Sequence, residues 1–200
     1  MLEAWAGKPA AWTWEQAGGA GLAVETATRA LDLLGVDEGT TLLIDGAAGG
    51  VGTAATQLAL ARGARVIATA SQPNHELLRS FGATPTSYGE GLADRVADLA
   101  PGGIDAALDV VGKGSVPVLV TLVDDPAQVV SLADFGAAQH GAGVATAGSV
   151  AAHGLAEAAR LAEENRFTVP IDSTFTLDEA AGAHRRSESG HARGKIIVRI

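Results

Sequence analysis

The chain has 200 residues, enough for one domain with a substantial buried core, and its 23 acidic and 14 basic residues give a net charge of −9. This charge argues against a nucleic-acid or anionic-membrane surface, because phosphate contacts require clustered lysine and arginine. The absence of cysteine excludes disulfides and thiolate zinc sites. We find neither a signal-peptide pattern nor an apolar run of membrane-spanning length, and therefore expect a cytoplasmic protein.

The first part of the chain combines an extension with a helix. Residues 1–14 contain Trp5, Trp12 and Trp14, which pack on their own domain or line an interface with another part. We expect a helix over residues 14–34, interrupted around the glycines of residues 18–21, and a turn over residues 36–40.

Residues 41–70, TLLIDGAAGGVGTAATQLALARGARVIATA, carry the main motif. They predict a strand over 41–44, a glycine-rich turn over 46–52, a helix over 54–62 and a strand over 66–69. Ala47, Gly49 and Gly52 occupy the three glycine positions of the dinucleotide fingerprint. Gly49 would let the main chain approach a pyrophosphate, Gly52 would let helix and strand pack closely, and the helix N-terminus would face the anion. The alternative is a purely structural turn.

The rest of the chain continues the alternation of strands and helices. We expect helices over residues 73–81, 91–99, 114–122, 155–165 and 177–187, and strands over 84–88, 106–111, 128–132, 144–147 and 195–200. This order predicts one α/β domain over residues 1–200. Its fold is a Rossmann-type, doubly wound parallel sheet of about six strands, with helices on both faces and ligands at the carboxyl ends of the strands.

The choice of cofactor depends on the residues after the second strand of the motif. An NAD site usually has an acidic residue there for the ribose hydroxyls, but residues 67–71 contain no carboxylate. Ser71, Asn74 and His75 offer neutral hydrogen-bond partners, so NADP(H) is favoured over NAD(H). In the alternative interpretation Ser71 and Asn74 cap the next helix.

Other chemistries find little support in the sequence. The five histidines (His75, His140, His153, His184 and His191) lack metal-ligand spacing, and neither a GxxxxGK phosphate loop nor a GxSxG nucleophile turn is present. Asp105, Asp109 and Asp134 lie near predicted strand ends, and Asp109 is expected to orient the backbone of its turn. No catalytic side chain stands out, which suits hydride transfer, where the protein mainly positions the cofactor.

Several blocks occur together in a recognisable order. These are GAAGGVG at 46–52, RVIATAS at 65–71, LRSFGAT at 78–84, LDVVG at 108–112, SLADFG at 131–136 and ESGHARGKIIV at 188–198. The chain thereby resembles the medium-chain dehydrogenase/reductases, and within them the zinc-independent quinone oxidoreductase branch. The resemblance implies an NADPH-dependent reductase of quinones or α,β-unsaturated carbonyls, which forms a homodimer through sheet edges.

The resemblance also implies a set of cofactor-binding residues. Gly49, Gly50 and Val51 would hold the pyrophosphate, with Ala48 and Thr69 beside them. The adenosine phosphate would lie near Ser71, Asn74 and Tyr88, although relatives often have lysine at position 74. The nicotinamide and its ribose would be lined by Val111, Gly112, Leu132, Ala133 and Phe135. Thr26 would face the ring, next to Glu25 where an apolar residue is usual, and Arg193 and Lys195 would lie on the loop at the cleft.

Members of this family begin with a separate barrel-like domain that forms much of the substrate cleft, and this sequence starts after it. Residues 195–200 would normally return to that domain, so here we expect an unpaired edge or a strand that pairs with another chain. Three functions stay open. The chain is the cofactor-binding part of a quinone or enone reductase, a module that senses NADPH through dimerisation, or the enoyl-reductase portion of a larger synthase.

Overall fold

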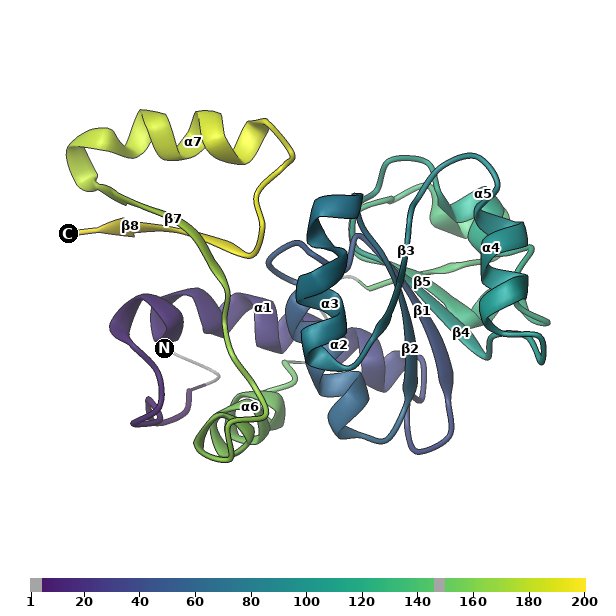
Figure 1. Ribbon diagram of the computed structural model, residues 1–200, viewed down its shortest axis with the longest axis horizontal. Coiled ribbons are helices and arrows are strands. Elements are labelled where there is room, and N and C mark those ends of the chain that lie inside the picture. The colour runs from purple at the N-terminus through teal and green to yellow at the C-terminus, as the bar shows by residue number, and fades with distance from the viewer. Residues whose placement is uncertain (1–4, 146–149) are drawn as a thin grey trace.

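The computed structural model describes residues 5–145 and 150–200. A parallel sheet of six strands lies at its centre, in the order β3-β2-β1-β4-β5-β6 (Figure 1). The strands are β1 (Thr41–Asp45), β2 (Arg65–Thr69), β3 (Thr84–Thr86), β4 (Ala106–Asp109), β5 (Val129–Ser131) and β6 (Gly143–Val144). This arrangement confirms the predicted doubly wound fold, and the strand order reverses direction at β1 and β4, where such sheets bind ligands.

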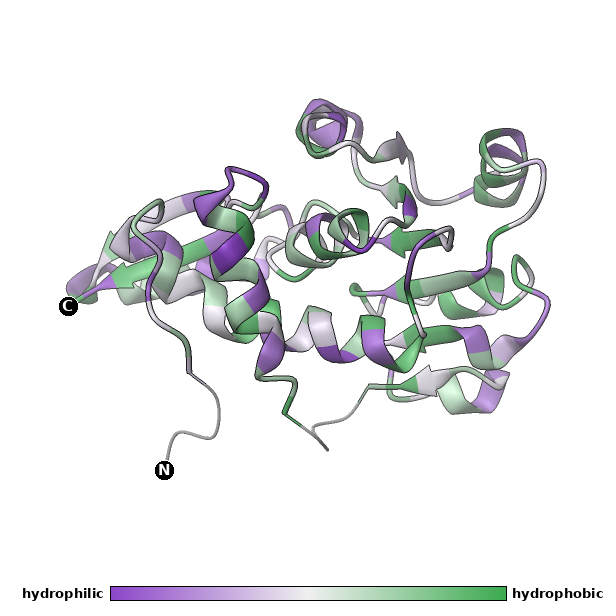
Figure 2. Ribbon diagram, turned by 90° about the horizontal axis from the view of Figure 1, so that it is seen from below, coloured by the Kyte–Doolittle hydropathy of each residue, from purple (hydrophilic) through white to green (hydrophobic). Residues whose placement is uncertain are grey.

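Alternate residues of the strands face two separate hydrophobic clusters. Leu42 and Ile44 of β1 pack in the larger cluster, whereas Leu43 between them packs in the smaller one. The larger cluster lies under α1 (Trp14–Leu33), α2 (Gly52–Ala61), α3 (His75–Phe81) and α6 (His153–Glu163), and the smaller one under α4 (Leu92–Leu99) and α5 (Val116–Leu119). Figure 2 shows hydrophobic residues along the central strands and hydrophilic residues on the outer sides of the helices.

The first helix differs from the prediction because it runs without interruption through Gly18–Gly21. A capping box starts it: the Thr13 hydroxyl accepts from the Gln16 N–H at 3.2 Å, and the Gln16 side chain accepts from the Thr13 N–H at 2.9 Å. Gly19 is buried, and a Cβ there would lie 3.2 Å from Lys195. The glycines lower helix propensity, but Gly19 allows a close contact that a larger residue would block.

Some elements are shorter than predicted. The helix expected over residues 114–122 is limited to α5, and the strand expected over 84–88 ends at Thr86. Of the strand expected over 144–147, Val144 belongs to β6, while residues 146–149 lie outside the described residues. Residues 1–4 of the predicted extension also lie outside them. The part of the chain that the structure describes also contains four 3-10 helices: η1 (Gln72–Asn74), η2 (Pro126–Gln128), η3 (Ala137–His140) and η4 (Leu177–Glu179).

A second, two-stranded sheet lies at one end of the molecule (Figure 1). It pairs β7 (Ile171–Thr176) with β8 (Lys195–Arg199) in parallel, and α7 (Ala180–Glu188) connects the two strands and contacts both. The sequence analysis missed β7, since IDSTFT has neither a long apolar run nor a clear alternation. The last strand, β8, is therefore paired on one side, and its partner β7 comes from the same chain. Within the described residues, no helix combines the length and apolarity that crossing a membrane requires.

Candidate cofactor-binding site

The glycine-rich loop after β1 lies at the carboxyl edge of the six-stranded sheet. Its glycines differ in what a side chain at each position would contact. A Cβ at Gly52 would lie 2.3 Å from the Gly46 carbonyl oxygen, and one at Gly50 would lie 2.6 Å from Lys195 Cδ. The backbone clash makes glycine necessary at position 52, whereas at position 50 a Cβ would meet the movable stem of Lys195 and, at 3.2 Å, the Gly194 carbonyl oxygen. At Gly49 the nearest atom would be the Gly46 oxygen at 3.5 Å, an ordinary contact. No contact within the described protein explains a glycine at position 49, whereas the close approach of a ligand would.

The start of this loop is fastened to β2. The Thr69 hydroxyl donates to the buried Asp45 carboxylate and accepts from the Gly46 N–H at 3.0 Å. The Ala47 N–H donates to the Thr69 carbonyl at 2.9 Å. Thr69 is fully buried, so its hydroxyl is not exposed to a ligand. Among the predicted cofactor-binding residues, it supports the loop through hydrogen bonds.

The loops after β4 and β5 are held by a second buried pair. One oxygen of Asp109 accepts from the N–H groups of Val111 and Gly112 at 2.9 and 3.0 Å, and the other accepts from the Ser131 hydroxyl at 2.7 Å. The Ser131 oxygen in turn accepts from the N–H groups of Ala133 and Asp134 at 3.2 and 2.8 Å. These bonds confirm the prediction that Asp109 orients its turn.

The predicted residues from these loops meet in space. A Cβ at Gly46 would lie 2.1 Å from Val111 Cγ2, and a Cβ at Gly112 would lie 2.7 Å from the Ala133 carbonyl carbon. A continuous surface therefore runs from the glycine loop across the β4 loop to the β5 loop. Leu132 is half-buried at its base, and Phe135 is 79% exposed at its far end.

The residues predicted for the adenosine end lie after β2 and β3. The Asn74 side-chain amide donates to the Ser71 hydroxyl at 3.2 Å, and neither side chain caps the following helix. The alternative interpretation, in which they act as helix caps, is therefore wrong. His75 contacts the Ala70 carbonyl through Nε2 at 3.0 Å, and Tyr88 is 59% exposed. None of these four side chains is a carboxylate, a lysine or an arginine.

A loop from the second sheet crosses the glycine loop. The Gly194 N–H donates to the Ala48 carbonyl at 3.0 Å, and Gly194 forms a parallel bridge with Gly49. The stem of Lys195 lies against Gly50, and burial lowers the pKa of its half-buried ammonium group. The two cations predicted at the cleft, Arg193 and Lys195, thus belong to a segment in direct contact with the predicted pyrophosphate loop.

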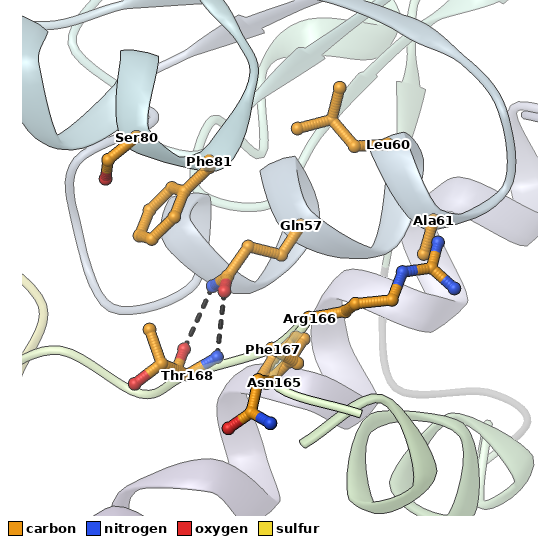
Figure 3. Close-up of a pocket in the computed structure, with 9 residues that line it drawn as sticks. All are labelled: Gln57, Leu60, Ala61, Ser80, Phe81, Asn165, Arg166, Phe167 and Thr168. Carbon is orange, nitrogen blue, oxygen red and sulfur yellow. Dashed lines mark hydrogen bonds between the residues drawn. The ribbon is translucent and has the colours of Figure 1, made fainter. Parts of the chain in front are cut away.

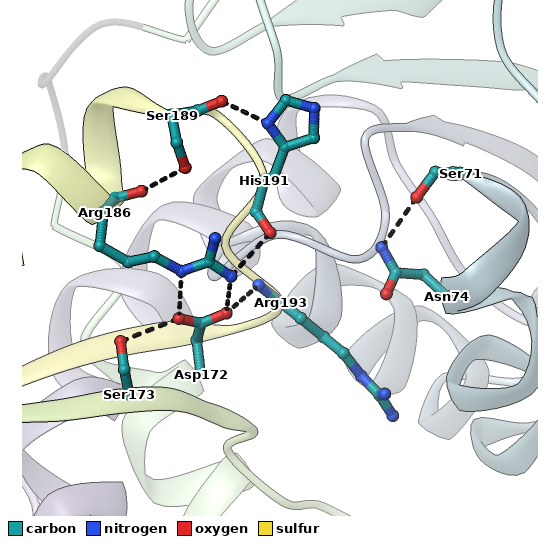
Figure 4. Close-up of polar contacts among 8 residues, drawn as sticks. All are labelled: Ser71, Asn74, Asp172, Ser173, Arg186, Ser189, His191 and Arg193. Carbon is teal, nitrogen blue, oxygen red and sulfur yellow. Dashed lines mark hydrogen bonds and ion pairs between the residues drawn. The ribbon is translucent and has the colours of Figure 1, made fainter.

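Asp172 of β7 fixes the position of this segment (Figure 4). Its carboxylate accepts from Arg186 Nε at 2.8 Å, from the second Arg186 nitrogen at 2.5 Å, and from the Arg193 N–H at 2.9 Å. The hydrogen bonds from Arg186 hold the pKa of the Asp172 carboxyl well below its usual range, with the Arg193 N–H contributing. The Arg193 side chain itself points away from this cluster (Figure 4).

Thr26 lies on α1, and its neighbour Glu25 is accommodated by specific contacts. Glu25 is paired with Arg29 at 3.1 Å and accepts from the Ala151 N–H at 3.3 Å, while Thr26 contacts the second Glu25 oxygen at 3.4 Å. Arg29 also donates to the Ala145 carbonyl at 2.9 Å. Glu25 therefore replaces the usual apolar residue without remaining an unpaired buried charge.

Two further predicted residues, Ala48 and Val51, lie within the glycine loop, buried and half-buried respectively. The structure also has a pocket of about 450 Å³ elsewhere, between α2, α3 and the segment after α6 (Figure 3). Gln57 closes one side of it through bonds of 2.9 and 2.8 Å to the Thr168 backbone. No predicted cofactor-binding residue lines this pocket: its walls are Gln57, Leu60, Ala61, Ser80, Phe81, Asn165, Arg166, Phe167 and Thr168.

Comparison with known proteins agrees with this geometry. A family model described as zinc-binding dehydrogenase matches residues 81–198, which is more than half of the chain. This chain belongs to the zinc-binding dehydrogenase family. It is thus a member of the medium-chain dehydrogenase/reductase superfamily, whose members are oxidoreductases.

Individual relatives cover different shares of the chain. It is 31% identical over 196 residues to a 2-methylene-furan-3-one reductase of Solanum lycopersicum, which covers 96% of this chain and 48% of the relative. It is 49% identical over 75 residues to a polyketide synthase of Streptomyces halstedii, covering 37% of this chain and 1% of the synthase. A quinone oxidoreductase from Coxiella burnetii superposes with a TM-score of 0.82 at 29% identity, over 98% of this chain and 63% of that one. The chain spans about half the length of the plant reductase.

The family description implies zinc, but the residues in hand do not fit that ion. The sequence has no cysteine, and over residues 5–145 and 150–200 no group of three or more histidine, aspartate or glutamate residues gathers to hold a metal. A dinucleotide fits better, because the backbone at Gly49 is open to close approach and the glycine loop leads directly into the N-terminus of α2, where an anion is favoured.

Sequence reasoning missed Asp45, Ser131 and Asp172 as supports of this site. Asp45 and Ser131 carried a weak signal, since each is a polar residue at the end of an apolar strand. Asp172 carried none, because its role depends on Arg186 and Arg193, which the fold alone brings to it.

Proposed function

We propose that this chain binds NADP(H) across the carboxyl edge of its six-stranded sheet and forms the cofactor-binding part of a reductase of quinones or α,β-unsaturated carbonyls. One observation carries the proposal. A Cβ at Gly49 would make only an ordinary contact, in a loop where a Cβ at Gly52 would clash with the backbone and one at Gly50 would be crowded by Lys195 and Gly194. A pyrophosphate that approaches the backbone at position 49 accounts for a glycine there.

The residues of the site would bind and orient the cofactor. The helix N-terminus at α2 would face the phosphates, with Lys195 supplying a positive charge beside the loop. The loops held by Asp109 and Ser131 would line the nicotinamide. When bound, NADPH would supply the hydride that reduces an enone at its β carbon, and the α carbon would take its proton from solvent. This chemistry requires neither zinc nor a nucleophilic side chain.

The preference for NADP(H) over NAD(H) is supported by the neutral surroundings of the adenosine end. Ser71 and Asn74 bond to each other, and no carboxylate occurs over residues 67–71 to attract ribose hydroxyls or repel a 2′-phosphate. We also expect a homodimer through the edge of the six-stranded sheet, which size-exclusion chromatography with light scattering would test.

The test is a titration of the chain with NADPH and NADH, followed by nicotinamide fluorescence. We expect saturable NADPH binding that is tighter than NADH binding and that Gly49→Val abolishes. Gly102→Val is the matched control, because a Cβ at this turn glycine meets nothing within 4 Å and the turn precedes β4, at the opposite edge of the sheet. If Gly49→Val binds NADPH as the wild type does, the loop is only a structural turn.

A second candidate is the enoyl-reductase portion of a larger synthase, favoured by the 49% identity to a polyketide synthase over 75 residues. The two candidates differ in substrate. The two substrate classes should be compared with NADPH in an assay of the longest protein that contains this chain. A synthase would reduce enoyl thioesters, whereas a quinone or enone reductase would prefer free quinones and enones.

A further inference from the structure

The carboxyl ends of the four central strands form a row of buried polar residues. Thr69 ends β2, Asp45 ends β1, Asp109 ends β4 and Ser131 ends β5. Asp45 is in register with Asp109, and Asp109 with Ser131, so their side chains lie on the same face of the sheet. All four are 6% exposed or less. Each half of the row consists of one aspartate and one hydroxyl residue.

The side chains of the first pair hold the glycine loop, while the Asp45 backbone carbonyl also accepts from the Val110 N–H at 3.1 Å, at the start of the β4 loop. The Thr69 hydroxyl bridges the Asp45 carboxylate and the Gly46 N–H, and the Thr69 carbonyl accepts from the Ala47 N–H. Because buried backbone N–H groups are costly to leave unpaired, these bonds fix the direction in which the chain leaves β1.

The second pair holds two different loops at once. Four consecutive bonds connect Asp109 and Ser131 to the N–H groups of Val111, Gly112, Ala133 and Asp134. The bond between the two side chains, at 2.7 Å, ties the β4 loop to the β5 loop. The loops also touch directly, since a Cβ at Gly112 would lie 2.7 Å from the Ala133 carbonyl carbon. A shift of one loop therefore displaces the other.

We propose that Asp109 and Ser131 are positioning residues for the nicotinamide end of the cofactor, separate from Asp45 and Thr69, which position its pyrophosphate end. This inference rests on the proposed NADP(H) site. Asp109 and Ser131 reach no exposed surface, so they act through the backbone of Val111, Gly112 and Ala133. The division between the two pairs predicts that the two ends of the cofactor respond to different substitutions.

The test removes one hydroxyl from each pair and measures two ligands. The probe 2′,5′-ADP contains the adenosine, its 2′-phosphate and one 5′-phosphate but no nicotinamide, whereas NADPH contains both ends. We expect Ser131→Ala to leave the affinity for 2′,5′-ADP unchanged, to weaken NADPH about tenfold, which is the loss of one or two hydrogen bonds, and to reduce the change in nicotinamide fluorescence on binding. Valine has nearly the same shape as threonine, so Thr69→Val removes only the hydroxyl. This substitution should lower the affinity for both ligands by a similar factor.

A general loosening of the fold would not produce this difference between ligands. If Ser131→Ala weakens both ligands equally, or neither, the inference is wrong while the proposed cofactor site stands. If the wild-type chain binds neither ligand, the proposed function fails and the inference fails with it. Should Ser131→Ala not fold, Ser131→Cys keeps the size and offers a weaker hydrogen-bonding group. The same selective loss of NADPH affinity is then expected on a smaller scale, and its absence overturns the inference.

Discussion

In the six-stranded sheet every residue of β4 is buried, whereas in the two-stranded sheet no residue of β7 or β8 is buried. The first sheet lies between two hydrophobic clusters. The second is attached by polar contacts such as the Arg199–Glu15 pair and the backbone bond from Gly194 to Ala48, and by Ile171, which packs against the larger cluster. The difference indicates that apolar burial stabilises the domain, while polar contacts determine how the loop that contains Arg193 and Lys195 lies on the glycine loop.

The largest contrast should appear when one apolar side chain is removed from each sheet. Leu43 is fully buried in β1, so we expect Leu43→Ala to lower the free energy of unfolding by about 2–5 kcal/mol. Phe175 in β7 is only half-buried, and Phe175→Ala should cost no more than about 1.5 kcal/mol. Urea denaturation of both variants measures the two values. Equal costs would contradict the division into an apolar and a polar sheet.

The same division explains which elements the sequence predicted. Residues 41–44 and 66–69 are apolar runs beside turn signals, and buried parallel strands require that composition. The break expected in α1 was wrong because local propensity at Gly19 is overridden by its packing against Lys195, a residue far away in the chain. β7 was missed for a related reason, since its pairing with β8 and the bonds of Asp172 depend on contacts that only the folded chain creates.

For the candidate site, sequence could supply the glycine loop and the strand ends but not their supports. The role proposed for Gly49 follows from the motif alone. The connections between Asp45 and Thr69 and between Asp109 and Ser131 require knowing which strands are neighbours, because the paired residues are 24 and 22 positions apart. The Arg193 segment requires still more, since it reaches the glycine loop from the second sheet.

A smaller effect is expected when the polar cluster around Asp172, which holds α7 and the Arg193 loop on β7, is weakened. Asp172→Asn removes the charge that Arg186 pairs with, and should lower the free energy of unfolding by about 1–2 kcal/mol. Because the Arg193 N–H also loses its carboxylate partner, NADPH affinity should fall several-fold while the six-stranded sheet stays folded. Fluorescence titration and urea denaturation measure the two effects. An unchanged NADPH affinity would show that the Asp172 contact does not contribute to NADPH binding.

The pH dependence of stability tests the same contact. The folded-state pKa of Asp172 is lowered from its ordinary 3.8, so its contribution is fully present above that value and is lost as pH falls below it. In Asp172→Asn this part of the acid-induced loss of stability should be absent. Thermal unfolding between pH 5 and about pH 3 compares the two proteins, and identical slopes would contradict the assignment.

The smallest effect on stability is expected at Lys195, where the two regions meet. Lys195→Met keeps the stem that lies against Gly50 but removes the half-buried charge, so stability near neutral pH should change by less than about 0.5 kcal/mol. Burial lowers the folded-state pKa of Lys195 from 10.5. Between that lowered value and 10.5 the unfolded chain binds more protons, so the wild type should gain stability as pH rises there, and Lys195→Met should not.

A bound pyrophosphate would reverse the balance at Lys195, because a charge that is unfavourable in the free protein would become favourable beside it. Lys195→Met should therefore weaken NADPH binding far more than it changes stability, and should make the affinity less sensitive to salt. Titrations at two ionic strengths measure this dependence, with Lys113→Met as a comparison because Lys113 is an exposed lysine on the β4 loop. If NADPH affinity falls by the same factor in both variants, the contribution of Lys195 is only general electrostatic attraction. A larger loss at Lys195 would locate the phosphates at the junction of the two sheets.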